Sequence, residues 1–275
     1  MIFESIFMIR GGAFGFDFGY KLIVSIITIL ICFYDWKTND KRLDYFWVFI
    51  TGTLIFIMAE IGMQFSGTRV LQEKFLFGVN ITTWLWLTIP LQAISEMTYL
   101  AVLGLLFSDK IMNEETRKHW TVYFIIVTIL RYIIPAIVLL SMGHNYANVN
   151  AGDPSIPSRR DIFAIETILS ILILSFLTLY WLIRTDRETR KRALFLFYTV
   201  LGLSIAWTIG EWITGQRWIE VGIKNPDGTY SHLQRADPLL EFVILAYDVV
   251  IEMVLMYISF LAIPYLLKLI KSEND

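Results

Sequence analysis

Seven stretches of this chain are apolar and long enough to cross a lipid bilayer, and this pattern constrains the fold more than any other feature. An α-helix rises about 1.5 Å per residue, so roughly 20 apolar residues cover the hydrocarbon core of a membrane. The sequence therefore predicts an all-α integral membrane protein, a seven-helix bundle forming a single domain over residues 1–275. The expected spans are residues 20–36, 43–65, 81–107, 122–142, 162–183, 193–215 and 239–270.

Basic residues predict how this bundle lies in the membrane. Thirteen lysines and arginines flank the spans on one side and nine on the other, and the richer side is expected to face the cytoplasm. The N-terminus is then outside and the C-terminus inside, in a multi-pass protein of the plasma or cytoplasmic membrane. The strongest contribution comes from residues 184–192, RTDRETRKR, which we interpret as a topology anchor and not as a nucleic-acid site.

Three segments are expected on the outer side. Residues 1–19 lack the basic start and cleavage pattern of a signal peptide, so they are interpreted as an interfacial segment. The loop 143–161 looks irregular. The loop 216–238 fits a small hairpin turning at residues 226–228. Each of these two loops fits either a cover over the mouth of a cavity or a plain connection.

The last apolar segment carries three carboxyl groups on one face. Glu241, Asp248 and Glu252 are spaced by seven and four residues, which on an α-helix places them within about 40° of one another. A carboxylate exposed to hydrocarbon costs several kcal/mol, so this stripe is expected to face the interior of the bundle.

Acidic side chains greatly outnumber basic ones inside the expected spans. Once the lysines at the span ends are counted as flanking residues, we expect only Arg131 to balance seven carboxyl groups within the spans. Protonation, hydration near the outer surface, or bound cations would each relieve the excess of negative charge. The seven are Glu60, Glu96, Glu166, Glu211, Glu241, Asp248 and Glu252.

Depth separates these carboxyl groups into two sets. Glu96, Asp248 and Glu252 lie on the order of 15–20 Å from the outer helix ends by helix rise, so we expect them to be functional. The others lie closer to the outer surface, Glu60 slightly deeper than the rest. Arg131 is expected to be the counter-ion of one deep carboxylate.

The chain lacks the residues that many cofactors require. His119, His144 and His232 all fall in expected loops, which argues against haem and against histidine-rich metal sites. Cys32 is the only cysteine, so a disulfide within the chain is impossible. We predict no cofactor and no firm metal site, and any metal would need oxygen ligands such as those of calcium, magnesium, manganese or sodium.

Short strings in three of the segments resemble microbial rhodopsins. These are TIPL at residues 88–91, WTIG at residues 207–210 and YDV at residues 247–249. The resemblance implies a seven-helix bundle with the N-terminus outside. In that family the retinal-binding lysine follows the aspartate by four residues, and here that position is Glu252, so covalent retinal is not implied. Glu60 and Asp248 also occupy places similar to the paired acids of integral-membrane terpene cyclases.

Three functions fit these residues. The leading hypothesis is the handling of protons or cations, in transport or ion-coupled binding. Its candidate residues are Glu96, Asp248, Glu252, Arg131, Glu60 and Glu211. The first alternative is a membrane-embedded acid–base enzyme acting on a lipid or isoprenoid, with Glu60 or Asp248 as the acid.

The second alternative is a seven-helix receptor or sensor with an outward-facing pocket for an amine-bearing ligand. The polar stripes of the third and sixth segments place Gln92, Tyr99 and Trp207 on the lining of an interior pocket. Expected partners are the bilayer and a proton, a small cation or a lipid-like or amine ligand. No nucleic acid is expected, and the sequence is compatible with an oligomer.

Overall fold

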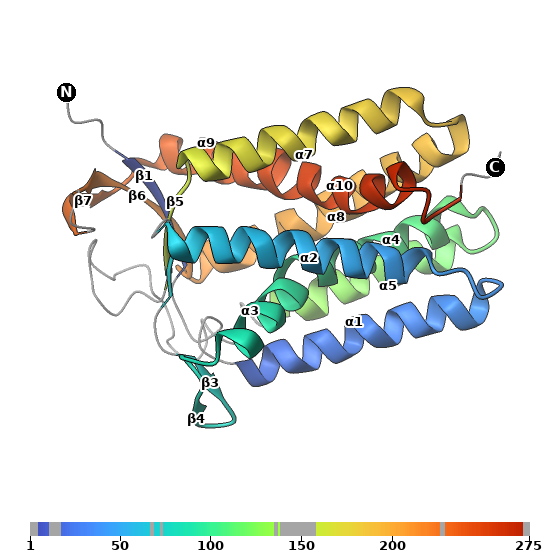
Figure 1. The fold of residues 1–275 in the computed structure, drawn as a ribbon, viewed down its shortest axis with the longest axis horizontal. Helices are drawn as coiled ribbons and strands as arrows, with labels where there is room; N and C mark the ends of the chain where they lie inside the picture. The colour runs from blue at the N-terminus through green and yellow to red at the C-terminus, as the bar shows by residue number, and fades with distance from the viewer. Residues whose placement is uncertain are drawn as a thin grey trace.

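The computed structural model describes residues 5–10, 18–66, 69–71, 74–134, 137, 158–225 and 229–271. These residues form a bundle of long helices with a small β-sheet across one end (Figure 1). The helices are α1 (Phe18–Thr38), α2 (Asp44–Phe65), α3 (Leu85–Ala93), α4 (Tyr99–Met112), α5 (Arg117–Thr128), α7 (Ile165–Arg184), α8 (Arg187–Ile213), α9 (Pro238–Tyr247) and α10 (Val254–Leu266). Three π-helical segments continue them, η2 (Ile94–Thr98), η3 (Ile129–Ile133) and η5 (Asp248–Met253).

Five of these helices are long and apolar enough to cross a membrane, which confirms five of the seven expected segments at that level. They cover Phe18–Thr38, Asp44–Phe65, Leu85–Met112, Ile165–Arg184 and Arg187–Ile213. The expected span 122–142 is described as a helix through residue 134, and its remainder lies largely outside the described residues. The last expected span is built by α9, η5 and α10 in direct succession.

Helix α4 forms the centre of the bundle. Every residue from Tyr99 to Ser108 is buried, as expected for a helix that is apolar on all sides. It packs closely on α8, where Gly104 leaves no room for a side chain because an added Cβ would lie 2.6 Å from a methyl group of Val200. The Thr199 hydroxyl fixes the same contact by donating to the Gly104 carbonyl oxygen at 2.9 Å.

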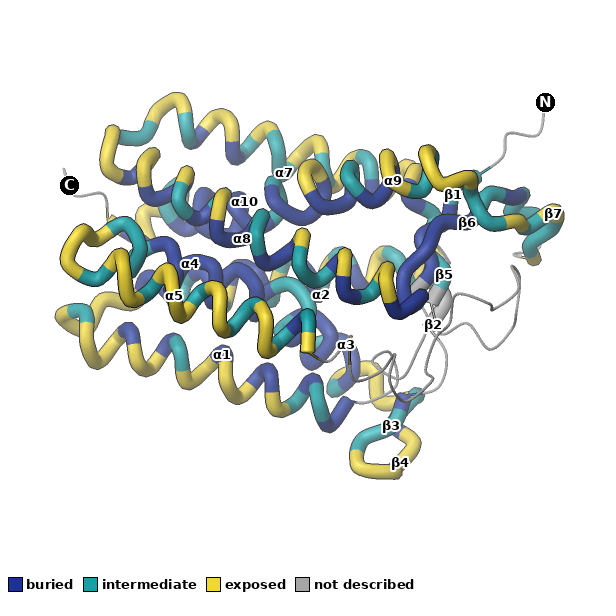
Figure 2. The backbone as a smooth tube through the Cα atoms, turned by 180° about the vertical axis from the view of Figure 1, so that it is seen from behind, coloured by how far each residue is buried: buried dark blue, intermediate teal, exposed yellow. Residues whose placement is uncertain are grey.

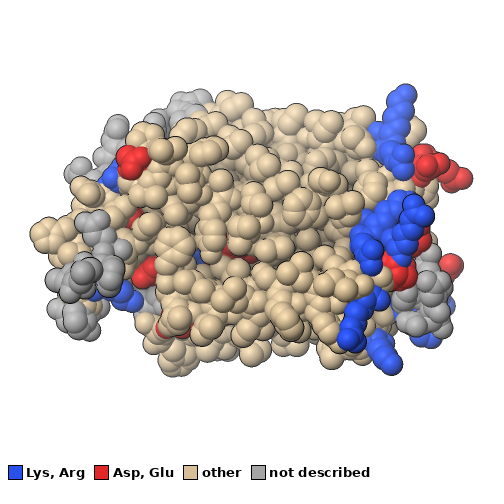
Figure 3. Space-filling view, turned by 90° about the horizontal axis from the view of Figure 1, so that it is seen from above, with Lys and Arg blue, Asp and Glu red and all other residues tan. Residues whose placement is uncertain are grey.

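The outer surface of the bundle is apolar. Large side chains such as Leu30, Met58 and Phe176 are 59%, 72% and 67% exposed. Figure 2 shows exposed positions recurring along the outer helices, and Figure 3 shows a middle with few charged side chains, which gather instead towards the two ends. An apolar belt of this extent is typical of a surface that contacts something other than water.

The sheet at one end of the bundle was not predicted. It is antiparallel, with strand order β2-β5-β1-β6-β7. Its strands are β1 (Ser5–Arg10), β2 (Arg69–Leu71), β5 (Ser158–Asp161), β6 (Arg217–Lys224) and β7 (Tyr230–Arg235), and a separate hairpin pairs β3 (Phe75–Leu76) with β4 (Val79–Asn80). We call the end of the bundle that carries this sheet the sheet end.

The sheet gives regular structure to segments that were expected to be loops or termini. Residues Ser5–Arg10 form its central strand, and Phe7 and Ile9 are fully buried. The loop 216–238 contains the expected hairpin as β6 and β7, although its turn at 226–228 lies outside the described residues. The sheet assembles strands from four distant parts of the chain, so hydrophobic periodicity within one segment carries no signal for it.

Candidate functional site

All the deep ionisable residues singled out in the sequence lie on π-helical segments. Glu96 is in η2, Arg131 in η3, and Asp248 and Glu252 are in η5. A π segment shifts the hydrogen bonding from i→i+4 to i→i+5 and widens the turn, and such segments occur frequently at functional sites. The π segments therefore single out the same part of the bundle as the buried charges do.

Asp248 and Glu252 are paired by an arginine from the sheet. Arg160 of β5 donates to both carboxylate oxygens of Glu252, with 3.0 Å between its Nη2 and Glu252 Oε2. The same Nη2 lies 3.3 Å from Asp248 Oδ1. Burial lowers the pKa of Arg160, but the two carboxylates outweigh this effect and raise the pKa above its usual value. Arg160 is therefore a permanent cation at this site.

A second arginine of the sheet extends the cluster. Arg217, the first residue of β6, is fully buried, and its Nη1 donates to Asp248 Oδ2 at 2.7 Å. Its Nε donates to Glu211 Oε2 at 2.7 Å, and its guanidinium lies 5.5 Å from the centre of the Trp207 ring. We call Arg160, Arg217, Glu211, Asp248 and Glu252 the outer charge cluster.

The outer charge cluster overturns the expected charge balance. The sequence offered Arg131 as the one base inside the spans, whereas Arg160 and Arg217 reach the carboxylates from residues expected in loops. The expectation of a single available base is therefore wrong. A buried carboxylate is most stable when it is both paired and hydrogen-bonded, and the two strands supply this pairing at the end of the bundle.

Arg131 has a different environment from the one expected. Its guanidinium lies 4.8 Å from the ring centre of Tyr20 and 5.0 Å from that of Tyr132. Within the described part of the chain it makes no ion pair, and its buried Nε has no hydrogen-bond partner. Tyr132 in turn stacks on Trp207, with ring centres 6.3 Å apart. Arg131 is thus held by aromatic faces and not by a carboxylate.

Glu96 is paired by a lysine at the start of the first helix. Lys21 is 4% exposed, and its Nζ lies 3.2 Å from Glu96 Oε1. Gln92 accepts a hydrogen bond from Lys21 and donates one to Glu96, which joins the three side chains into one buried network. Gln92 and Glu96, four residues apart on one helix, are therefore in contact, and Lys21 joins them from α1.

The remaining predicted acids are dispersed. Glu60 is fully buried on α2 and accepts from Gln64 Nε2 at 2.8 Å. Glu166 is exposed in the first turn of α7. Glu241 lies in the first turn of α9 and forms no ion pair with the outer charge cluster, so the three-residue stripe expected in the last span is divided.

A cavity of about 420 Å³ lies beside the outer charge cluster. It is bounded by α2, η2, α7, η5 and α10, with Met8 of β1 and Arg160 of β5 at the sheet end. Glu96, Glu166, Asp248 and Glu252 contribute to its walls, and most of the other lining residues are apolar. Six of the nine methionines of the chain line it, namely Met8, Met58, Met63, Met97, Met253 and Met256.

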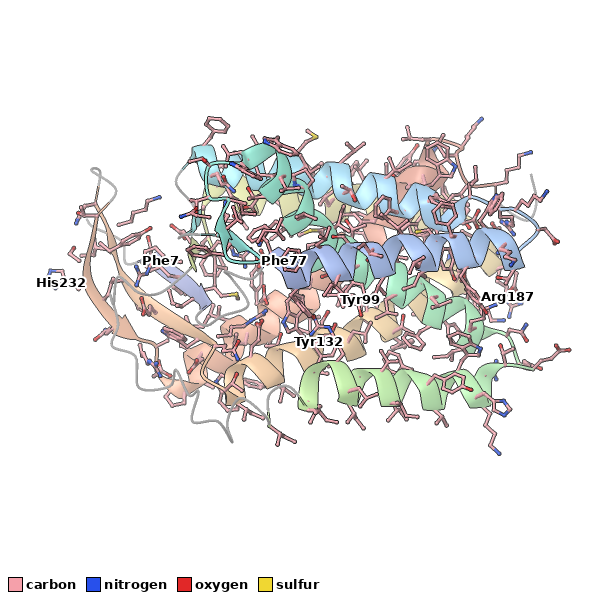
Figure 4. All side chains as sticks on the ribbon, turned by 90° about the horizontal axis from the view of Figure 1, so that it is seen from below. Phe7, Phe77, Tyr99, Tyr132, Arg187 and His232 are labelled. Atoms are coloured by element: carbon pink, nitrogen blue, oxygen red, sulfur yellow. The ribbon has the colours of Figure 1, made fainter. Side chains whose placement is uncertain are left out.

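The predicted pocket residues do not line this cavity. Gln92 lies in the network with Lys21, and Trp207 donates from its indole nitrogen to Glu211 Oε1 at 2.7 Å. Tyr99 is buried in α4, and Figure 4 shows it and Tyr132 midway along the bundle, far from His232 and Arg187 at the two ends.

A second buried charge cluster lies at the opposite end of the bundle and was not predicted. Arg192 forms two hydrogen bonds to Asp109, at 2.8 and 2.7 Å, and a third to Asp44 at 2.9 Å. It also donates to the Tyr265 hydroxyl at 3.0 Å. The cluster joins α2, α4, α8 and α10. Arg192 belongs to the run 184–192 that we interpreted as a topology anchor, and it also joins four helices through these hydrogen bonds.

The described residues hold no group of three or more His, Cys, Asp and Glu side chains arranged to bind a metal ion. Of the histidines expected in loops, His119 lies in α5 and His232 in β7, while His144 is outside the described residues. No protein-family model matches the chain, and no match was found among curated proteins or solved structures.

Proposed function

We propose that this is an integral membrane protein that binds a lipid-like, amphipathic molecule in the cavity between α2 and α7. In this proposal seven helical segments cross the bilayer, the sheet lies outside and the C-terminus is cytoplasmic. The exposed apolar belt supports insertion, because a water-exposed bundle would not present Leu30, Met58 and Phe176 to solvent. The basic residues at the end opposite the sheet support the orientation (Figure 3).

The observation that carries this proposal is the composition of the cavity walls. A volume of about 420 Å³ falls within the range of roughly 300–1,000 Å³ found for small-molecule sites. The walls are apolar over most of their extent and charged where Arg160, Asp248 and Glu252 meet the sheet. Methionine side chains adapt to irregular shapes, so the six that line the cavity suit a flexible apolar chain.

Access from the bilayer is supported by the packing of α7. This helix lies along α10 and touches α2 only sparsely, and the cavity is bounded by both α2 and α7 (Figure 1). Met58 and Ile173, on the two sides of this gap, are 72% and 59% exposed. A lipid-like molecule would therefore enter from the side, without crossing the sheet.

The test is to block the cavity and to analyse what co-purifies with the protein. At Gly62 an added Cβ would meet nothing within 4 Å, so Gly62→Phe can project its ring into the cavity without a backbone clash. Its matched control is Ile61→Phe, on the neighbouring face of α2, where the side chain does not line the cavity. Native mass spectrometry should show a bound lipid-like molecule in the wild type and in Ile61→Phe, and its loss in Gly62→Phe.

Equal retention by both variants, or no bound molecule in any well-folded preparation, would refute the proposal. The same spectra address the enzyme hypothesis, because a bound molecule whose mass changes on incubation with the protein would indicate turnover. In that case Asp248, which lines the cavity, is better placed for acid–base chemistry than Glu60, which does not.

Proton or cation handling is the second candidate, and one observation favours it. The three deep carboxyl groups, Glu96, Asp248 and Glu252, share one cavity and lie on two π-helical segments. Proteoliposomes under imposed pH and potential gradients provide the test, with wild type compared to Asp248→Asn. Flux that depends on Asp248 would support transport, and no flux from folded wild-type protein would exclude it.

A further inference from the structure

We infer that the polar group of the bound molecule is a protonated amine, so that the ligand is a cationic amphiphile. This inference rests on the proposed function, because it assumes that the cavity between α2 and α7 holds a lipid-like molecule. It adds the chemical class of the headgroup, which the cavity walls specify by their charge and hydrogen-bonding capacity.

Hydrogen-bond acceptors dominate the charged part of the cavity. Four acidic residues line the cavity, Glu96, Glu166, Asp248 and Glu252, whereas Arg160 is the one cationic residue among the described lining residues. The two Nη atoms of Arg160 are already engaged, since they donate to Asp248 and Glu252, and Nη2 also contacts Met8 Sδ at 3.7 Å. An incoming headgroup therefore meets acceptors and needs donors of its own.

A buried hydroxyl supplies independent support for a ligand at this place. Thr167 lies in the first turn of α7, lines the cavity and is only 8% exposed. Its Oγ1 has no hydrogen-bond partner within the described residues. A buried polar atom without a partner costs free energy, so a headgroup that donates to Thr167 Oγ1 would remove that cost on binding.

Electrostatics disfavours the opposite class of headgroup. The outer charge cluster holds three carboxylates against two arginines, and Glu166 adds another acid to the cavity walls, so a carboxylate, sulfate or phosphate entering there would meet an excess of negative charge. An ammonium group gains from the same charges and carries three donors, as the side chain of lysine does. The cavity therefore discriminates between headgroups on an identical apolar chain.

The experiment uses three ligands with one chain length: decylamine, decanol and decyl sulfate, titrated at pH 7 into the full-length protein in nanodiscs. At this pH an alkylamine is protonated, as the lysine amine is. Labelling the methionine methyl groups with ¹³C places six probes in the cavity walls, and Met112 in α4 serves as a probe away from them. Titration of empty nanodiscs corrects for partition into the lipid.

We expect decylamine to shift the cavity methyl signals, leave Met112 unchanged and bind at least tenfold more tightly than decyl sulfate. Thr167→Val should weaken decylamine binding about tenfold, as loss of a hydrogen bond to a charged group predicts. The matched control is Thr178→Val, because Thr178 is also buried on α7 with an unpartnered Oγ1 but does not line the cavity.

The outcomes separate this inference from the proposed function. Equal or tighter binding of decyl sulfate or decanol at the cavity methyl groups would overturn the amine headgroup and leave the lipid-like ligand standing. Failure of all three ligands to shift these signals would overturn both. Undiminished decylamine affinity in Thr167→Val, with the methyl spectrum otherwise intact, would overturn the role of Thr167.

Discussion

Replacing Arg160 by methionine tests whether the sheet stabilises the bundle by neutralising its buried acids. Arg160 is 17% exposed, and its partner Glu252 is 2% exposed. The substitution keeps an unbranched apolar side chain in place of the arginine stem but removes the guanidinium, so Glu252 loses the only cation with which it forms an ion pair in the described residues. Asp248 retains Arg217 at 2.7 Å. The perturbation therefore falls mainly on one carboxylate.

The expected cost follows from the burial of that carboxylate. Removing one partner of a buried ion pair costs about 3–5 kcal/mol, because the other charge remains without compensation in a region of low dielectric constant. For a chain of this size each kcal/mol lowers the melting temperature by roughly 2–4 °C, so Arg160→Met should lower it by about 10 °C. Glu252→Gln removes the orphaned charge, and the double variant should recover a large part of the loss.

Thermal unfolding in detergent, followed by intrinsic tryptophan fluorescence, measures the wild type, both single variants and the double variant as a cycle. Arg131→Met is the matched control, because Arg131 contacts aromatic rings and pairs with no carboxylate in the described residues. Arg131→Met should lower the free energy of unfolding by about 1–2 kcal/mol, because it removes only the cation–π contacts. The reasoning fails if Arg131→Met destabilises as much as Arg160→Met, or if the effects of Arg160→Met and Glu252→Gln are additive.

Two further predictions concern the packing and capping of the helices. Gly104→Ala should lower the free energy of unfolding by about 1–3 kcal/mol, because the added methyl group clashes with Val200. Gly62→Ala should raise it by roughly 0.5–1 kcal/mol, because the added methyl group meets nothing within 4 Å. Melting temperatures of the two variants that shift in the same direction would contradict this prediction. Asp186 caps α8 by accepting a hydrogen bond from the backbone amide of Thr189 at 2.9 Å. Asp186→Ala should therefore lower the free energy of unfolding by about 1 kcal/mol in the same thermal assay. An unchanged melting temperature would show that the cap is dispensable.

Much of the helical framework could be predicted from the sequence, because a membrane-spanning helix is encoded locally. The hydrogen bonds of such a helix lie within the segment, so length and apolar composition are sufficient to find it. The same local logic accounts for the contact of Gln92 with Glu96, which lie four residues apart on one helix. It did not locate the cavity: Gln92 and Tyr99 flank η2 without lining the cavity, and Trp207 lies on α8, which does not bound it.

The partners of the buried acids could not be predicted in this way. Arg160 is separated by 88 residues from Asp248 and by 92 from Glu252, and it reaches them only because β5 pairs with β1 at the end of the bundle. A count of the charges within the expected spans therefore missed the arginines that pair with the buried carboxylates. The π-helical geometry of η2, η3 and η5 is also set by packing, since the sequence does not distinguish an i→i+5 bond from an i→i+4 bond.

The sequence by itself determined that this chain forms long apolar helices and that carboxyl groups lie deep within them, because both properties depend on residues close together in the chain. Only the tertiary structure decided which charges meet, where an empty volume lies between the helices and which polar atoms face it. These depend on contacts between distant segments, such as β5 with η5 and α2 with α7, and no local pattern encodes them.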